Sequence, residues 1–87
     1  MNQEQEKEAK LKEFFERARK GVLKYLDDKG GVLSLSDLHD YSLKTYFIQH
    51  QRFSMMIETF VEEELATYDH QSENIFITDK GKEFVIC

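Results

Sequence analysis

The apolar positions between residues 53 and 65 recur at helical spacing. Six of them are separated by steps of three and four: Phe53, Met56, Ile57, Phe60, Val61 and Leu65. Steps of this size put side chains on one face of an α-helix. The pattern predicts a long helix here, with that face buried.

After Ala66 the pattern changes to that of a β-hairpin. Thr67-Tyr68 and Ile75-Phe76-Ile77 are rich in β-forming side chains, and the polar run 69–74 separates them. Two such runs joined by a short polar segment are typical of a hairpin. Thr78 then either caps a short last helix containing residues 80–85 or ends the second strand.

The first third of the chain has the pattern of one long amphipathic helix, residues 3–29. Its apolar seam steps by four and three as in a coiled coil, and two more residues widen it: Leu11, Phe15, Ala18, Val22 and Tyr25, with Phe14 and Leu26. Gly21 inside this pattern predicts a break or a close helix contact. Gly30-Gly31 predicts the end of the helix, because glycine readily adopts the positive φ of a C-terminal cap.

Residues 32–35 alternate and favour a short strand, which leaves two possible starts for the next helix. Ser34 as N-cap would form a capping box with Asp37, flanked by Leu33 and Leu38 as a hydrophobic staple. Ser36 as N-cap would leave a longer strand, and we prefer it for that reason. In either case we expect a short helix that ends near Ser42, with Leu38, Tyr41 and Leu43 as its candidate inward residues.

This order of elements resembles the winged helix-turn-helix family. The residues that carry the likeness are 75–84, Ile-Phe-Ile-Thr-Asp-Lys-Gly-Lys-Glu-Phe. They are similar to that family's ending of aromatic, apolar, Thr, Lys-Gly, two polar residues and Phe or Leu. The type resembled is the small archaeal DNA-binding protein that dimerises through a long added helix. The resemblance implies an α+β fold: a helical extension over residues 1–13, then a winged-helix domain over 14–87 with a three-helix core and a small antiparallel β-wing.

The stretch from residue 44 to 51 departs from that family. About four more residues than usual separate Leu38 from the core position assigned to Ile57. Either the long helix begins one turn early, near Lys44, or the turn before it is enlarged. In an enlarged turn Tyr46, Phe47 and Ile48 could be buried. At most one or two of them would then be free to contact a ligand.

The formal net charge of −5 argues against nucleic acid, because phosphate binders usually carry an excess of Lys and Arg. The charge is unevenly distributed, however: residues 1–30 sum to +1, residues 31–66 to −4 and residues 67–87 to −2. No acid occurs between Asp40 and Glu58, and the long helix carries its acids late. The interval before Glu58 is therefore the stretch that would repel a phosphate backbone least.

The resemblance implies a sequence-specific DNA-binding transcriptional regulator that reads the major groove of double-stranded DNA with the helix beginning near residues 44–51. Gln and Arg pair with adenine and guanine at base edges, and hydroxyl or cationic side chains suit phosphate. The residues expected at DNA are Lys44, Tyr46, Gln49, His50, Gln51, Arg52 and Ser54, with Gln71, Ser72 and Asn74 from the wing. The wing contains no Lys or Arg. Together with the acidic balance, this motivates the alternative of a winged-helix protein–protein interaction module.

We expect a homodimer, because the apolar seam of the first helix continues beyond what a single domain needs to cover its core. The interface residues predicted are Leu11, Phe14, Phe15, Ala18 and Val22. In a monomer the earliest of these would remain exposed.

The sequence gives little support for an active site or a metal site. Ser36 and His39 lie three apart without a recognisable acid partner, and His39, His50 and His70 lack the paired spacing of a zinc site. We therefore expect no enzyme, no metal and no cofactor. No run approaches the roughly 18 apolar residues of a membrane span, so a cytoplasmic location without a membrane partner is expected.

Overall fold

The computed structural model describes residues 3–86, with side chains from residue 10 onward. In this part the chain forms an α+β fold of four helices and one small antiparallel sheet. The elements are α1 (Gln3–Asp28), β1 (Val32–Ser34), α2 (Leu35–Tyr46), α3 (His50–Glu62), β2 (Ala66–Asp69), β3 (Asn74–Ile77) and α4 (Asp79–Ile86). This confirms the predicted class and order, and it is compatible with a winged helix.

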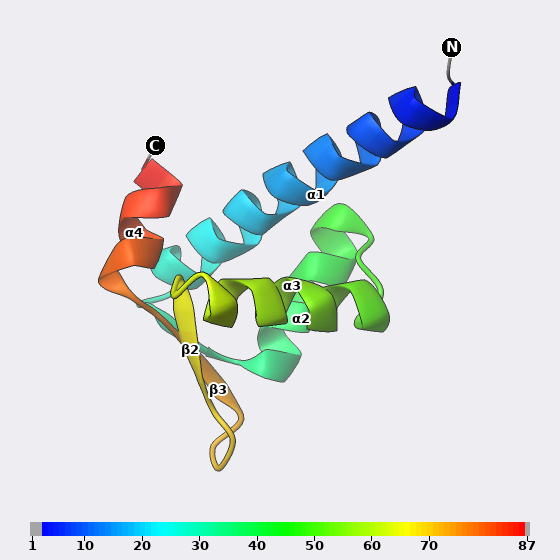
Figure 1. Ribbon diagram of the computed structural model, residues 1–87. Coiled ribbons are helices and arrows are strands. Elements are labelled where there is room, and N and C mark those ends of the chain that lie inside the picture. The colour runs from blue at the N-terminus through cyan, green and yellow to red at the C-terminus, as the bar shows by residue number, and fades with distance from the viewer. Residues whose placement is uncertain (1–2, 87) are drawn as a thin grey trace.

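Helix α1 is continuous and longer than the body that it covers. Its first half projects away from the other helices, and the molecule measures 47 × 26 × 21 Å (Figure 1). Gly30 and Gly31 follow it with positive φ, and the Gly31 N–H donates to the Leu26 carbonyl at 2.9 Å. Gly21 does not break the helix. It lies against the Tyr46 side chain, so the close-contact alternative is the one observed.

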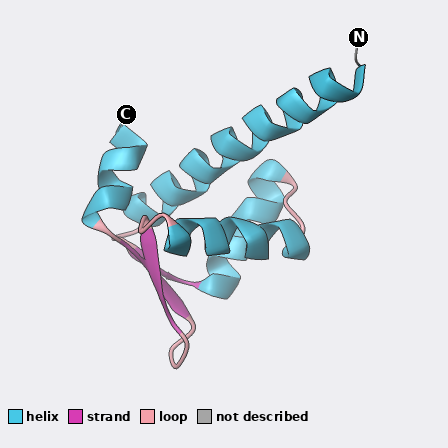
Figure 2. Ribbon diagram, viewed as in Figure 1, coloured by secondary structure: helices cyan, strands magenta, loops and turns pink. Residues whose placement is uncertain are grey.

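The sheet has the strand order β1-β3-β2, with all pairs antiparallel (Figure 2). Ile75 in the central strand lies between Leu33 and Tyr68 and is fully buried. It packs with the buried face of α1, which contributes Ala18, Val22, Leu23 and Leu26. The β2–β3 hairpin projects from the body as the wing expected from the sequence pattern.

Helix α2 starts and ends at places other than those preferred from the sequence. Ser34 is the N-cap, because its hydroxyl accepts a hydrogen bond from the Asp37 N–H at 3.1 Å. The preference for Ser36 is therefore wrong. Strand β1 stops at Ser34 because α2 begins there, and the Leu35 N–H still donates to the Glu73 carbonyl of the wing turn at 2.9 Å.

The extra residues of the stretch 44–51 lengthen α2 by one turn, so both sequence-based alternatives are wrong. Helix α2 continues to Tyr46, and α3 begins at His50 after a three-residue turn, 47–49. Phe47 adopts a left-handed conformation with φ of 57° and is 82 % exposed, while Ile48 is buried. The expectation that at most one or two aromatic or apolar residues here are free is confirmed.

The core face of α3 is narrower than its pattern suggests. Phe53, Met56, Ile57 and Phe60 are buried as predicted, and Leu65 is buried beyond the helix end. Val61 is exposed, which contradicts the prediction. Leu43 of α2, one of the candidate inward residues, is exposed as well.

Thr78 joins the end of α3 to the start of α4. Its hydroxyl accepts from the Gly81 N–H at 3.0 Å and donates to the Glu64 carbonyl at 2.6 Å. Of the two alternatives for Thr78, the cap of a short last helix is the one observed. Gly81 is buried directly against the Leu65 carbonyl.

One charged side chain is buried where α1, α3 and α4 meet. Arg19 is 5 % exposed and forms 2.9 Å ion pairs with Glu16 and Glu63. Its guanidinium also lies 5.6 Å from the ring centre of Phe60 and 5.7 Å from that of Phe84. Burial alone would lower the pKa of Arg19, but the hydrogen bonds that its guanidinium donates to Glu63 and Glu16 outweigh it, and the pKa is raised.

Candidate nucleic-acid interface

The first two turns of α3 present an exposed polar surface without an acid. His50, Gln51, Arg52 and Ser54 are all exposed, and the first acidic residue of the helix is Glu58. Gln49 is the N-cap, and its side chain makes no capping hydrogen bond. The free N–H groups of a helix start carry partial positive charge, which favours anions.

A hollow of about 370 Å³ lies beside this surface. It is formed by the start of α2, the start of α3 and the β2–β3 turn, and we call it the wing hollow. Its lining residues are Ser34, Leu35, Ser36, His39, His50, Phe53, Ser54, Ser72 and Glu73. The hollow joins the exposed part of α3 to the wing.

Two histidines that the sequence analysis treated as scattered meet in this hollow. The rings of His39 and His50 have centres 5.6 Å apart at an angle of 72°, and His39 also lies 4.8 Å from the ring centre of Phe53. The Nε2 atom of His39 is buried and has no hydrogen-bond partner. The signal available in the sequence was the three-residue spacing of Ser36 and His39, which places both on one side of α2.

The wing turn is held by its own polar side chains. The Asp69 carboxylate accepts from the Gln71 N–H at 3.2 Å and from the Ser72 hydroxyl at 2.7 Å. The Ser72 bond, followed by the Gln71 bond, lowers the pKa of Asp69. Gln71 and Ser72 are exposed at the tip. Asn74 is instead half-buried within β3, opposite Ser34 and Asp69, and does not lie at the tip.

Lys44 and Tyr46 do not belong to this surface, because the added turn of α2 carries them away from α3. Lys44 lies near the end of α2, with its Nζ 3.6 Å from the Asp40 carboxylate. Tyr46 is half-buried and packs edge-on against Phe14 and Tyr41. Burial and then Tyr41 raise the pKa of the Tyr46 hydroxyl. Neither residue lies on α3 or lines the wing hollow.

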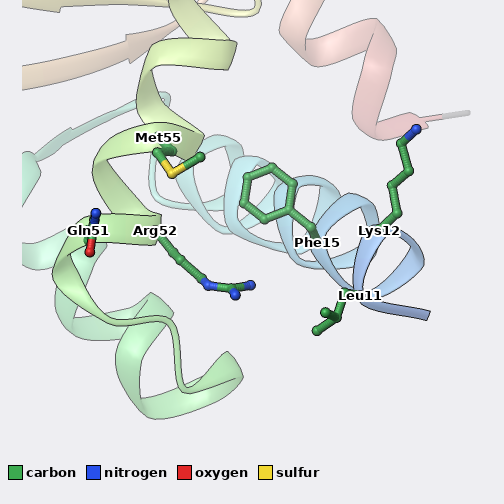
Figure 3. Close-up of a pocket in the computed structure, with 6 residues that line it drawn as sticks. All are labelled: Leu11, Lys12, Phe15, Gln51, Arg52 and Met55. Atoms are coloured by element: carbon green, nitrogen blue, oxygen red, sulfur yellow. The ribbon is translucent and has the colours of Figure 1, made fainter. Parts of the chain in front are cut away.

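A second hollow, of about 570 Å³, separates the first half of α1 from α3, and we call it the α1–α3 groove. Figure 3 shows its six lining residues: Leu11, Lys12, Phe15, Gln51, Arg52 and Met55. The Arg52 side chain extends from α3 toward α1. Among the described residues neither Lys12 nor Arg52 has an ion-pair partner. Met55 is 54 % exposed.

The predicted dimer residues divide into two groups. Leu11 is 50 % exposed and Phe14 is 41 % exposed, while Phe15 packs against the core from a half-buried position. Ala18 and Val22 are fully buried within the single chain. They are therefore not available at the surface of this chain, because α2, α4 and the sheet pack against the second half of α1.

The described residues contain no group of three His, Cys, Asp or Glu side chains that could hold a metal ion. None of the helices in the described part is long and apolar enough to cross a membrane. No protein-family profile, curated protein sequence or solved structure matches the chain. Arguments about function therefore depend on the surface of the molecule itself.

Proposed function

We propose that this chain is a winged helix-turn-helix protein that binds double-stranded DNA sequence-specifically and regulates transcription in the cytoplasm. The observation that carries the proposal is the surface around the start of α3. Four polar residues are exposed there without an acid, beside a hollow that the wing turn completes. A helix start flanked by a wing is the arrangement with which such folds enter the major groove.

The residues that we propose contact DNA are chosen by their position on α3. Gln51 is exposed in the first turn and is the first candidate for reading adenine. Arg52 can reach guanine or phosphate after its side chain leaves the α1–α3 groove. His50 and Ser54 face the wing hollow and suit the phosphate backbone. Gln71 at the wing tip is the side chain available to contact an adjacent groove of the DNA.

The acidic residues restrict how DNA can approach. Glu58 and Glu62 are exposed on the second half of α3 and would repel phosphate there. The positive end of the α3 dipole and Arg52 favour the first half. We therefore propose that α3 enters the groove by its N-terminal end, with its C-terminal end held away from the backbone.

We further propose that the DNA-binding form is a homodimer joined through the first half of α1. The supporting observation is that Leu11 and Phe14 are exposed on the part of α1 that projects beyond the body. Two-fold symmetry would place the two α3 helices about one DNA turn apart, near 34 Å, or a multiple of this.

A specific observation favours a second candidate, a protein–protein interaction module. Met55 and Val61 are exposed apolar residues on α3, next to Glu58 and Glu62. Apolar residues bordered by acids suit a basic protein partner better than they suit phosphate.

Selection from a random pool of duplex oligonucleotides discriminates between the two candidates. The DNA-binding proposal predicts enrichment of a defined sequence by the wild-type protein, and loss of that enrichment in a folded Gln51→Ala/Arg52→Ala variant. No enrichment at low salt would favour the interaction module.

A further inference from the structure

The α1–α3 groove carries a charge opposite to that of the whole chain. The formal net charge is −5, yet the six described residues that line the groove include two cations, Lys12 and Arg52, and no acid. Arg52 is the only Lys or Arg between residues 45 and 79. An anion is therefore attracted to this groove more than to the second half of α3, where Glu58 and Glu62 are exposed.

Most of the remaining lining of the groove is apolar. Met55 on α3 lies opposite Phe15 on α1 (Figure 3), and Leu11 extends this lining toward the projecting end of α1. Leu11 and Met55 are 50 % and 54 % exposed, so they leave apolar surface that a ligand can bury. A volume of about 570 Å³ with a few polar groups among apolar side chains is typical of a small-molecule site.

Arg52 supplies the position for a negatively charged group. Its side chain extends across the groove toward α1 (Figure 3), and it forms no ion pair with another described residue. A guanidinium binds a carboxylate through two parallel hydrogen bonds, and neighbouring apolar side chains strengthen such bonds by excluding water. Gln51 also lines the groove and can add an amide donor.

A single carboxylate on an apolar chain matches both parts of the groove. One cation extends into it, so it fits one anionic group beside an apolar body. An acidic amphipathic helix would need anchors repeated over two turns and a longer groove to receive them. A nucleic-acid phosphate would leave Phe15 and Met55 without an apolar partner.

We propose that the α1–α3 groove binds a free aliphatic monocarboxylate of medium chain length, with its carboxylate on Arg52 and its chain along Phe15 and Met55. The bound carboxylate holds Arg52 in the groove and thereby weakens DNA binding. This second part rests on the proposed DNA-binding function, whereas the binding site itself does not.

Methyl NMR of the full chain tests the site, with two neighbouring methionines as reporters. Met55 lines the groove, and Met56, which is fully buried in the core, is the control in the same molecule. Decanoate is added at pH 7, where carboxylic acids are ionised. It should give a saturable shift of the Met55 methyl signal and none of the Met56 signal. Decanol, which lacks the charge, should bind about tenfold more weakly, and acetate, which lacks the chain, should give no saturable shift.

Arg52→Gln removes the charge at an exposed position and leaves the fold intact. This variant should bind decanoate about tenfold more weakly than the wild type does, and no more tightly than it binds decanol. Lys82→Gln is the matched control, because it removes an exposed cation of α4 that does not line the groove. It should bind decanoate as the wild type does.

Several results would overturn the site. They are the absence of a saturable Met55 shift, equal shifts of Met55 and Met56, and an Arg52→Gln protein that binds decanoate as tightly as the wild type. A Met55 signal that moves with protein concentration but not with decanoate would place a second copy of this chain in the groove, which also overturns the site.

DNA binding is measured separately, so that the two proposals fail separately. In fluorescence anisotropy with a labelled duplex, saturating decanoate should weaken binding by the wild type about tenfold and should not affect binding by Arg52→Gln. An unchanged wild-type affinity would overturn the effect on DNA. If the wild type binds no DNA without decanoate, the proposed function and this effect both fail, and the Met55 shift still decides whether the groove binds the carboxylate.

Discussion

At the scale of single residues, Gly81 shows how packing can reverse a helix propensity. It lies inside α4, where Ala is ordinarily favoured over Gly by about 1 kcal/mol. However, a Cβ at this position would collide with the backbone carbonyl of Leu65 and with the Ile77 side chain. A backbone group cannot move aside as a side-chain end can, so α4 must shift.

Gly81→Ala is therefore expected to lower the free energy of unfolding by about 1–3 kcal/mol, as overpacking does. Lys82→Ala, an exposed neighbour on the same helix, should change it by less than about 0.5 kcal/mol. Urea unfolding followed by circular dichroism at equal protein concentrations measures both. A Gly81→Ala protein as stable as the wild type would show that α4 is not held against Leu65.

At the scale of elements, the start of α2 decides what lies in the wing hollow. The Ser34 hydroxyl caps the helix, whereas the Ser36 hydroxyl has no partner in the described chain. Ser34→Ala should lower the free energy of unfolding by about 1 kcal/mol, and Ser36→Ala by much less. The same unfolding measurement compares them. A larger loss from Ser36→Ala would move the cap to that residue and contradict the observed start.

Most elements could be predicted because their signals are local. The Gly30-Gly31 stop, the Thr78 cap and the change from helical to alternating spacing at Ala66 each depend on neighbouring residues, and each is confirmed. The extent of α2 could not be predicted in this way. Its extra turn is stabilised by contacts between Tyr46 and α1, which are distant in sequence.

The candidate site was predictable only in part for the same reason. The exposed, acid-free start of α3 follows from the sequence, because charge and helical spacing are local properties. The meeting of His39 with His50, and the direction of Arg52 toward α1, depend on how α2 and α1 pack against α3. Lys44 and Tyr46 lie in the last turn of α2 instead of at the start of the next helix, because α2 continues beyond Ser42.

At the scale of the whole molecule, the proposed homodimer depends on the half of α1 that projects beyond the body. Leu11 and Phe14 are exposed there, and we expect Leu11→Glu/Phe14→Glu to convert a dimer into a monomer by burying charge at the interface. Ile86→Glu, on an apolar residue of α4 that is also exposed, is the control and should stay dimeric. Sedimentation equilibrium at micromolar concentration gives the masses. A wild-type protein of monomeric mass would contradict the dimer.

The central claim is that the first half of α3 contacts DNA, and the salt dependence of binding to a selected duplex tests it most directly. In a folded Gln51→Ala/Arg52→Ala protein we predict a loss of about 1–3 kcal/mol of specific binding for a base contact, or a salt slope smaller by about one for a phosphate contact. Lys82→Ala on α4 should match the wild type in both affinity and salt slope. A double variant with unchanged affinity and unchanged salt slope would contradict the account.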